Sequence, residues 1–222
     1  MVNERRQLLK QSLWLGGLGL LAPMTKAAEV CVNTPAQTSG PFYPGEAKFT
    51  TTHDLTRVPG KIQRAEGRII HLSGRVINGL CQPLVGANVE IWQACASGRY
   101  NNPNDPNPAP LDENFAYWGE AFTDQEGKFY FKTIQPGAYQ ADSDWKRPPH
   151  IHFRVSKLGY RELTTQMYFA GDPLNEKDLI LQDTPADQRD QLVVNFVEGW
   201  GPDGSEGGLG EFTLIMVPVR RS

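Results

Sequence analysis

Two histidines separated by one residue, His150 and His152, are the side chains of this sequence best spaced to bind a metal ion. In an extended strand, residues two apart project to the same face, so the two imidazoles would lie side by side. Tyr100 and Tyr139 each follow a glycine closely, at expected junctions of strand and loop from which a side chain can reach a cleft. If both tyrosines join the histidines, two phenolates and two imidazoles suit a ferric ion better than zinc.

A His-x-His pair alone also fits other metal sites. A ferrous site with two histidines and one carboxylate needs an acidic side chain that faces the pair. Asp144 and Glu162 are candidates, but the spacing favours neither of them. Zinc bound by histidines is a further alternative. His53 and His71 lack paired spacing and are expected to be surface or core residues.

The elements that must position these side chains are short strands. Glycine and proline supply 39 of the 222 residues and separate short alternating segments, which favours an all-β fold. One helix is expected to begin at Thr184, with Pro185 at its first position. Strands are expected over residues 68–77, 87–94, 121–123, 128–133, 150–156, 163–169, 192–197 and 211–219.

The segments 74–92 and 123–131 resemble the transthyretin-like (prealbumin-like) sandwich modules of secreted proteins. We therefore expect a single all-β domain, a β-sandwich whose long loops form the metal site. Residues 101–116 carry four prolines and several Asn and Asp residues, and long loops on a β scaffold often carry function. Because such modules also occur as non-catalytic appendages, an exported binding module is the alternative function.

The first 27 residues have the composition of an export signal. Arg5 and Arg6 form a twin-arginine pattern, an apolar stretch follows over residues 13–22, and small residues suited to cleavage follow at Ala27 and Ala28. The apolar stretch is short for a membrane span. We expect a periplasmic or secreted protein, exported by the twin-arginine pathway and free of the membrane once the signal is removed.

The charge of the mature chain argues against nucleic acid as a partner. Removal of residues 1–27 takes four of the 22 basic and one of the 25 acidic residues, which leaves 18 and 24 and a formal net charge of −6. About 195 residues remain, enough for one domain with a sizeable core. We expect an extended N-terminal arm over residues 28–66 and the sandwich over residues 67–222.

Three cysteines, Cys31, Cys81 and Cys95, lie in the mature chain. An oxidising compartment permits a disulfide, and an odd count leaves at least one thiol unpaired. Cys81 and Cys95 lie near opposite ends of one expected strand, so the sequence leaves the pairing open. The spacing Cys-x-x-Cys does not occur, which argues against a cysteine-rich metal site.

Four segments resemble the intradiol ring-cleavage dioxygenases, most closely the protocatechuate 3,4-dioxygenase branch. They carry the family's metal-ligand positions in order and spacing, and they are residues 92–100, 133–139, 147–153 and 165–173. The resemblance runs roughly from Gln37 to Asp178. Only a short linker-like stretch precedes residue 68, so we expect no helical N-terminal domain of the kind typical of catechol 1,2-dioxygenases.

The resemblance implies one non-haem Fe(III) per chain, bound by Tyr100, Tyr139, His150 and His152. It implies that O2 cleaves a catechol between its two hydroxylated carbons to give a cis,cis-muconate. In the family, the second tyrosine, here Tyr139, leaves the metal and can take a proton from the substrate. Arg147 matches the family arginine that stabilises charge developing on the substrate ring.

The resemblance also implies residues that bind the substrate. Gly40, Pro41 and Phe42 lie in a segment that the non-catalytic subunit contributes to the pocket of protocatechuate enzymes. Here the N-terminal arm is expected to contribute it, in a self-sufficient pocket or in a homo-oligomer. Trp92 matches an aromatic pocket wall, and Gln166 matches a glutamine near the family arginine, although core packing and structural support would explain them as well.

One departure from the family concerns the part of the pocket expected to recognise the substituent on the catechol ring. The protocatechuate branch follows its second tyrosine with Pro-Trp, whereas Gln140 and Ala141 follow Tyr139 here. The catechol that this chain takes therefore does not follow from the resemblance.

Overall fold

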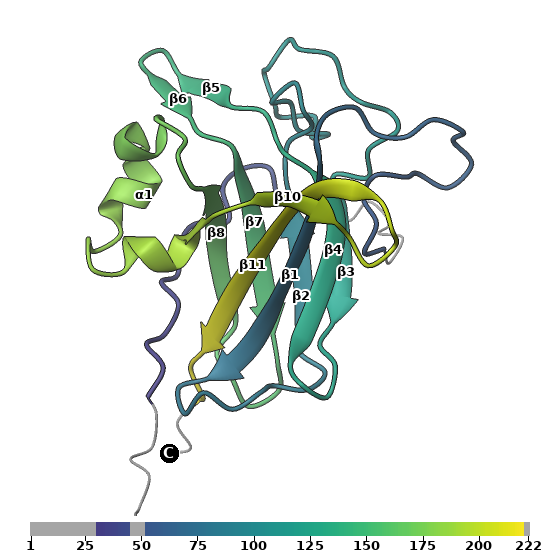
Figure 1. The fold of residues 1–222 in the computed structure, drawn as a ribbon. Helices are drawn as coiled ribbons and strands as arrows, with labels where there is room; N and C mark the ends of the chain where they lie inside the picture. Colours follow the sequence, from purple (N-terminus) through teal and green to yellow (C-terminus); the bar gives the residue numbers. More distant parts are fainter. Residues whose placement is uncertain (1–29, 45–51, 220–222) are drawn as a thin grey trace, which may run out of the picture.

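Two β-sheets stacked face to face make up most of this computed structural model, which describes residues 30–44 and 52–219 (Figure 1). The strands of the first sheet are, in order, β10 (Val197–Trp200), β11 (Glu206–Met216), β1 (Ile69–Asn78) and β4 (Lys128–Ile134). Those of the second sheet are β3 (Trp118–Phe122), β2 (Asn88–Trp92), β7 (His150–Ser156), β8 (Leu163–Phe169) and β9 (Val193–Val194). The expected β-sandwich is confirmed.

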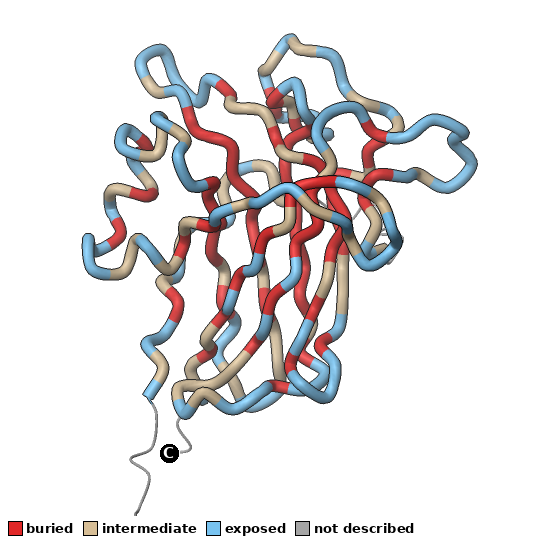
Figure 2. Tube along the Cα trace, in the orientation of Figure 1, coloured by how far each residue is buried: buried red, intermediate tan, exposed pale blue. Residues whose placement is uncertain are grey.

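The core lies between the two sheets, where alternate residues of each strand point inward. Figure 2 shows these buried positions along the strands of both sheets. Phe153 of β7 meets Phe212 of β11 across the interface, with ring centroids 5.0 Å apart and the rings at 63°. Both side chains are almost completely buried. Burial of such large apolar side chains is the main stabilising contribution to the sandwich.

Two parts of the fold differ from the strands expected from the sequence. The segment 192–197 is not one strand, because a 3-10 turn (Arg189–Leu192), β9 and β10 divide it. A separate hairpin, β5 (Tyr139–Asp142) and β6 (Trp145–Arg147), was not expected. Its strands are too short to show an alternating pattern, and residues 140–142 are exposed. Residues 101–116 contain neither helix nor strand, as expected.

The prediction that a helix begins at Thr184 is wrong. The helix α1 (Leu179–Asp183) ends there instead, and the Thr184 amide bonds to the carbonyl of Leu181. Proline restricts the residue before it to extended conformations, and Thr184 has φ −71° and ψ 135°. The side chain of Asp178 caps the true start by accepting a hydrogen bond from the Leu181 amide.

The described part of the N-terminal arm lies along the sandwich and is fastened near its start. Cys31 forms a disulfide with Cys81 across a sequence separation of 50 residues, and Cys95 is a buried free thiol. Farther on, the Thr34 amide bonds to the carbonyl of Ile215 in β11. The expected export signal lies outside the described residues.

The disulfide is expected to stabilise the folded chain by about 2 to 4 kcal/mol, because it closes a long loop of the unfolded chain. Replacing Cys31 and Cys81 together by serine should lower the free energy of unfolding by that amount, measured by denaturant titration. Adding reductant to the wild type should give a similar loss and should leave the double variant unchanged. Equal stability of wild type and variant would contradict the assigned pairing.

Candidate metal centre

The strand β7 presents the two histidines to one side of the five-stranded sheet. It is bonded to β2 and to β8, so its backbone is held on both edges. The rings of His150 and His152 have centroids 4.9 Å apart, and each residue is 2% exposed. Trp92 of β2 stacks flat on His152, with centroids 4.9 Å apart and an interplanar angle of 6°. Because Trp92 is fully buried, it supports this imidazole from behind.

The segments just before Tyr100 and Tyr139 touch each other, and a glycine allows this close approach. Gly98 has φ +83°, and a Cβ there would lie 2.5 Å from the carbonyl oxygen of Ala138, so only glycine fits. The Tyr100 amide donates to Oδ2 of Asp105 at 2.6 Å, which fixes the tyrosine to the long loop. The rings of Tyr100 and Tyr139 meet edge to face, with centroids 5.7 Å apart.

The four expected metal-binding side chains converge from three separate segments. The Oη atom of Tyr100 lies 3.3 Å from Nε2 of His150. Ring centroids are 5.8 Å apart for Tyr139 and His150, and 6.2 Å apart for Tyr100 and His152. The structure therefore brings together the whole donor set that the sequence suggests.

Burial sets the protonation of these four groups. It lowers the pKa of His150 and His152 well below the ordinary value, with further lowering by the charge of Arg147. Both imidazoles are therefore neutral and able to donate a lone pair. Burial raises the pKa of Tyr100 well above 10 and also raises that of Tyr139. Their phenolates would need a nearby cation.

This donor set fits a ferric ion. The described residues hold no cluster of three or more His, Cys, Asp and Glu suited to a metal, so a metal here would depend on the tyrosine oxygens. Nδ1 of His150 donates to the carbonyl of Pro148 at 2.8 Å, so the lone pair that could bind a metal is on Nε2. Nδ1 of His152 is buried and, among the described residues, has no hydrogen-bond partner. A trivalent cation would stabilise the two phenolates.

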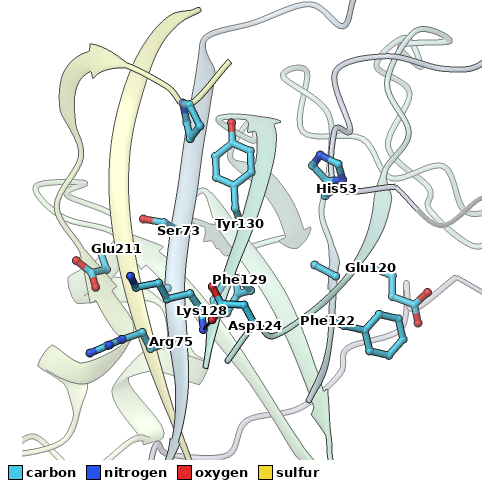
Figure 3. A pocket seen from close by; sticks show the side chains of 13 residues that line it. His53, Ser73, Arg75, Glu120, Phe122, Asp124, Lys128, Phe129, Tyr130 and Glu211 are labelled. Carbon is cyan, nitrogen blue, oxygen red and sulfur yellow. Dashed lines mark hydrogen bonds between the residues drawn. The ribbon is translucent and has the colours of Figure 1, made fainter. Parts of the chain in front are cut away.

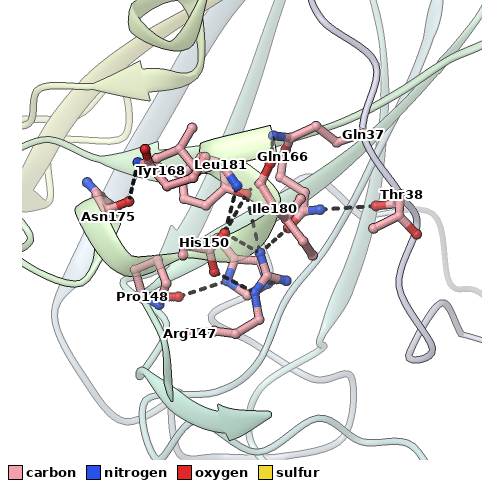
Figure 4. Close-up of polar contacts among 12 residues, drawn as sticks. Gln37, Thr38, Arg147, Pro148, His150, Gln166, Tyr168, Asn175, Ile180 and Leu181 are labelled. Carbon is pink, nitrogen blue, oxygen red and sulfur yellow. Dashed lines mark hydrogen bonds and ion pairs between the residues drawn. The ribbon is translucent and has the colours of Figure 1, made fainter. Parts of the chain in front are cut away.

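Arg147 lies beside the donor set with its guanidinium bonded on several sides (Figure 4). It is 3% exposed. Nε donates to Oδ2 of Asp178 at 2.9 Å, Nη2 to Oε1 of Gln166 at 2.8 Å, and Nη1 to Nε2 of His150 at 3.1 Å. Burial alone would lower the pKa of Arg147, but the hydrogen bond and charge of Asp178 raise it above its ordinary value. The arginine stays charged.

Asp178 is a functional candidate that could not be recognised from the sequence. It is fully buried, pairs with Arg147 and caps α1. The available signal was an aspartate just before the apolar run Leu179–Leu181, a pattern typical of a helix start. Gln166 is also fully buried, and it joins the arginine to the N-terminal arm by donating from Nε2 to the carbonyl of Thr38 at 3.1 Å.

The N-terminal arm closes one side of a pocket beside the tyrosines. The ring of Phe42 lies 4.8 Å from that of Tyr100 and 6.2 Å from that of Tyr139. Gly40 has φ +65°, and a Cβ there would lie 3.4 Å from Cε1 of His152. The pocket has a volume of about 430 Å³ and is lined by Thr38, Gly40, Pro41, Phe42, Asp105, Pro106, Tyr139, Gln140, Ala141, Trp145, Arg147 and Ile180.

A polar cluster anchors the arm just after Phe42. Tyr43 donates to Oε2 of Glu90 at 2.8 Å, and Arg154 binds both oxygens of Glu90 and lies over the Tyr43 ring at 4.2 Å. Burial and the hydrogen bond to Glu90 raise the pKa of Tyr43 to about 12, so it remains a donor. Tyr43 also meets Trp92 edge to face, which connects the anchor to His152.

A larger hollow of about 810 Å³ lies on the outer face of the four-stranded sheet (Figure 3). It shares no lining residue with the pocket beside the tyrosines. Acidic and basic side chains alternate along it, among them Arg75, Asp124, Lys128 and Glu211. Lys128 already pairs with Glu126 at 2.7 Å. The enclosed donor set, and not this open surface, is therefore the candidate chemical site.

Comparison with known proteins agrees with this geometry. The family described as Dioxygenase matches residues 38–200. The protocatechuate 3,4-dioxygenase beta chain of Burkholderia cepacia is 41% identical over 79% of this chain and 76% of its own length.

Two solved structures share the fold. The dioxygenase domain of a dioxygenase carbohydrate-binding protein fusion from Streptomyces sp. SirexAA-E has a TM-score of 0.63 and 28% identity, and the match covers 85% of this chain and all of that one. Catechol 1,2-dioxygenase from Acinetobacter sp. ADP1 has a TM-score of 0.64 and 27% identity, over 84% of this chain and 63% of that one. The chain belongs to the intradiol ring-cleavage dioxygenase family.

Proposed function

We propose that this chain uses non-haem Fe(III) and O2 to cleave a catechol between its two hydroxylated carbons, releasing a cis,cis-muconate. The observation that carries the proposal is the convergence of Tyr100, Tyr139, His150 and His152 beside a pocket that Arg147 also lines. These four side chains would hold one iron per chain. A non-catalytic binding module, the alternative, would have no need of such a buried donor set.

Tyr139 and Tyr100 differ in a way that supports separate roles. Bound ferric iron would supply charge that favours the ionised form of a catechol. Tyr139 lines the pocket, whereas Tyr100 is not among its lining residues and is 3% exposed. Because burial raises the pKa of Tyr139, its Oη is a strong base once no cation holds it. Tyr139 is therefore the group suited to take a proton from a catechol hydroxyl.

Arg147 is suited to stabilise negative charge on the substrate ring. Its guanidinium carries a fixed charge and is buried, and it lines the pocket together with the apolar side chains of Phe42, Trp145 and Ile180. A preorganised charge in a dry site is usually a large catalytic contribution.

The residues of the pocket wall favour a catechol whose ring substituent carries no charge. Arg147 is the one cationic side chain among the described residues that line it, and this guanidinium already binds Asp178 and Gln166. Asp105 adds an acidic group to the same wall. A substituent carboxylate would lose its hydration there and would have to share Arg147 with Asp178. Catechol and its alkyl derivatives fit this wall better than protocatechuate does.

We also propose that the chain is exported by the twin-arginine pathway and works in the periplasm or outside the cell. The residues that carry this proposal, Arg5 and Arg6, lie outside the described part of the chain. Within residues 30–44 and 52–219, no helix is long and apolar enough to cross a bilayer. The disulfide between Cys31 and Cys81 supports an oxidising compartment.

Tyr100→Phe and Tyr139→Phe are each expected to weaken or shift the visible tyrosinate-to-iron absorption of the iron-loaded protein, because each removes one phenolate. Absorption and iron content are measured on the same samples. Tyr160→Phe is the control, since the Tyr160 backbone pairs with Pro218, outside the site. Unchanged absorption and iron content in both ligand variants would refute the assigned donor set.

We expect kcat/KM for 4-methylcatechol to exceed that for protocatechuate by at least about 10-fold, because the carboxylate has no free cation to pair with. Ala141→Arg should narrow this ratio by placing a cation on the pocket wall. Ala141→Met, of similar length without charge, should leave the preference as it is. Product identification by mass spectrometry checks the cleavage position. If the wild type prefers protocatechuate, the prediction of an uncharged ring substituent is wrong.

Replacing Arg5 and Arg6 together by lysine is expected to leave precursor in the cytoplasm, because the pathway reads the arginine pair. Cell fractionation followed by immunoblotting measures the distribution. Lys10→Arg keeps the pair and should export normally. Undiminished recovery of the Lys-Lys variant outside the cytoplasm would mean a different route.

A further inference from the structure

The buried carboxylate of Asp178 contacts three parts of the site at once. It pairs with Arg147 through Nε at 2.9 Å and Nη2 at 3.3 Å. It accepts a hydrogen bond from the Leu181 amide at 2.9 Å, which fixes the start of α1. The Tyr168 hydroxyl lies 3.4 Å from Oδ1. Figure 4 shows the guanidinium and its hydrogen bonds beside α1.

The other nitrogens of Arg147 have different kinds of partner. Nη2 donates to Gln166 at 2.8 Å and to the Tyr168 hydroxyl at 3.2 Å, both buried protein groups. Nη1 donates to Nε2 of His150, at 3.1 Å. That nitrogen must be the acceptor, because Nδ1 of His150 donates to the carbonyl of Pro148.

A metal bound by His150 would use the same Nε2 lone pair that now accepts from Arg147. An imidazole nitrogen has one lone pair, so metal binding removes the acceptor of Nη1. The bonds of Nε and Nη2 do not depend on that nitrogen and can persist. A metal bound to His150 would therefore remove the hydrogen bond of Nη1 and leave those of Nε and Nη2 in place. Arg147 lines the pocket, so Nη1 would then be available there.

Asp178 also connects this guanidinium to α1, which contributes a second residue to the pocket wall. Ile180, two residues later in α1, lines the pocket. Gln37 of the arm donates to the carbonyl of Ile180 at 3.4 Å and to the Thr184 hydroxyl at 3.0 Å. One carboxylate thus sets the position of both the arginine and the helix that faces the substrate.

We propose that Asp178 is the positioning residue of the reaction. It holds Arg147 through Nε and Nη2, so that Nη1 would be the nitrogen left available to the substrate if His150 bound a metal. The inference rests on the proposed function. Asp178 does not touch the substrate, and its effect on turnover passes through Arg147.

The first variant is Asp178→Asn, which has nearly the same shape and remains a good helix cap but loses the charge. We expect it to keep its iron and its visible absorption, to lose kcat by about 10-fold or more, and to change KM much less, because small displacements of a catalytic group are costly. Asp178→Glu keeps the ion pair and the fold but displaces the guanidinium, so it should also lose turnover. Asp172→Asn is the control, since the Asp172 side chain accepts a hydrogen bond from the nearby Leu174 amide and has no hydrogen bond to Arg147 among the described residues.

A double variant tests whether the effect passes through the arginine. Arg147→Ala should lose at least about 10²-fold in kcat, and adding Asp178→Asn to it should cost little more. In the metal-free protein, the Nε–H signal of Arg147 in a proton–nitrogen NMR spectrum should be shifted or lost in Asp178→Asn and unchanged in Asp172→Asn. This measurement is independent of turnover.

Unchanged kcat in iron-loaded Asp178→Asn and Asp178→Glu would overturn the inference, as would additive losses in the double variant. Either result would leave the proposed function standing if the wild type cleaves catechol. An iron-loaded wild type that cleaves no catechol would instead overturn the proposed function and the inference with it.

Discussion

The pairing of β7 on both of its edges is the constraint on which the site depends. This strand carries His150 and His152 on one side, and its neighbours place Trp92 behind one ring and Tyr168 beside the other. A slip of one residue would turn both imidazoles to the opposite face of the sheet. Tyr100 lies on a loop and Tyr139 begins the small hairpin of β5 and β6, and both lie outside the two packed sheets. Their convergence therefore relies on a strand that cannot shift without breaking two ladders.

Much of this arrangement could be predicted from the sequence. The spacing of His150 and His152 determines that they share a face of a strand, and glycines close to Tyr100 and Tyr139 indicated backbone that could carry a side chain into a cleft. The turn residues between short alternating segments were sufficient for the sandwich. Strand periodicity and turn chemistry are local properties, and local properties can be read from one sequence.

Contacts between distant segments could not be predicted in this way. Asp178 acquires its importance from a guanidinium 31 residues earlier in the chain, and this separation gives no periodic signal. The roles of Gln166 and Trp92 were left open for the same reason, because both depend on burial against a ring or a guanidinium from another segment. The pairing of Cys31 with Cys81 and the end of α1 at Thr184 likewise depend on tertiary packing.

The hairpin formed by β5 and β6 has a paired base and an exposed tip, and both contribute to the pocket. Tyr139 and Arg147 are paired directly across its base, so the proton acceptor and the charged group that we propose are held side by side. Beyond that pair, Gln140 and Ala141 are exposed and still form part of the pocket wall. Mutations at the tip can therefore alter which molecules enter without disturbing the chemistry at the base. In such a hairpin, the residues that would set the substrate preference are separate from those proposed to react.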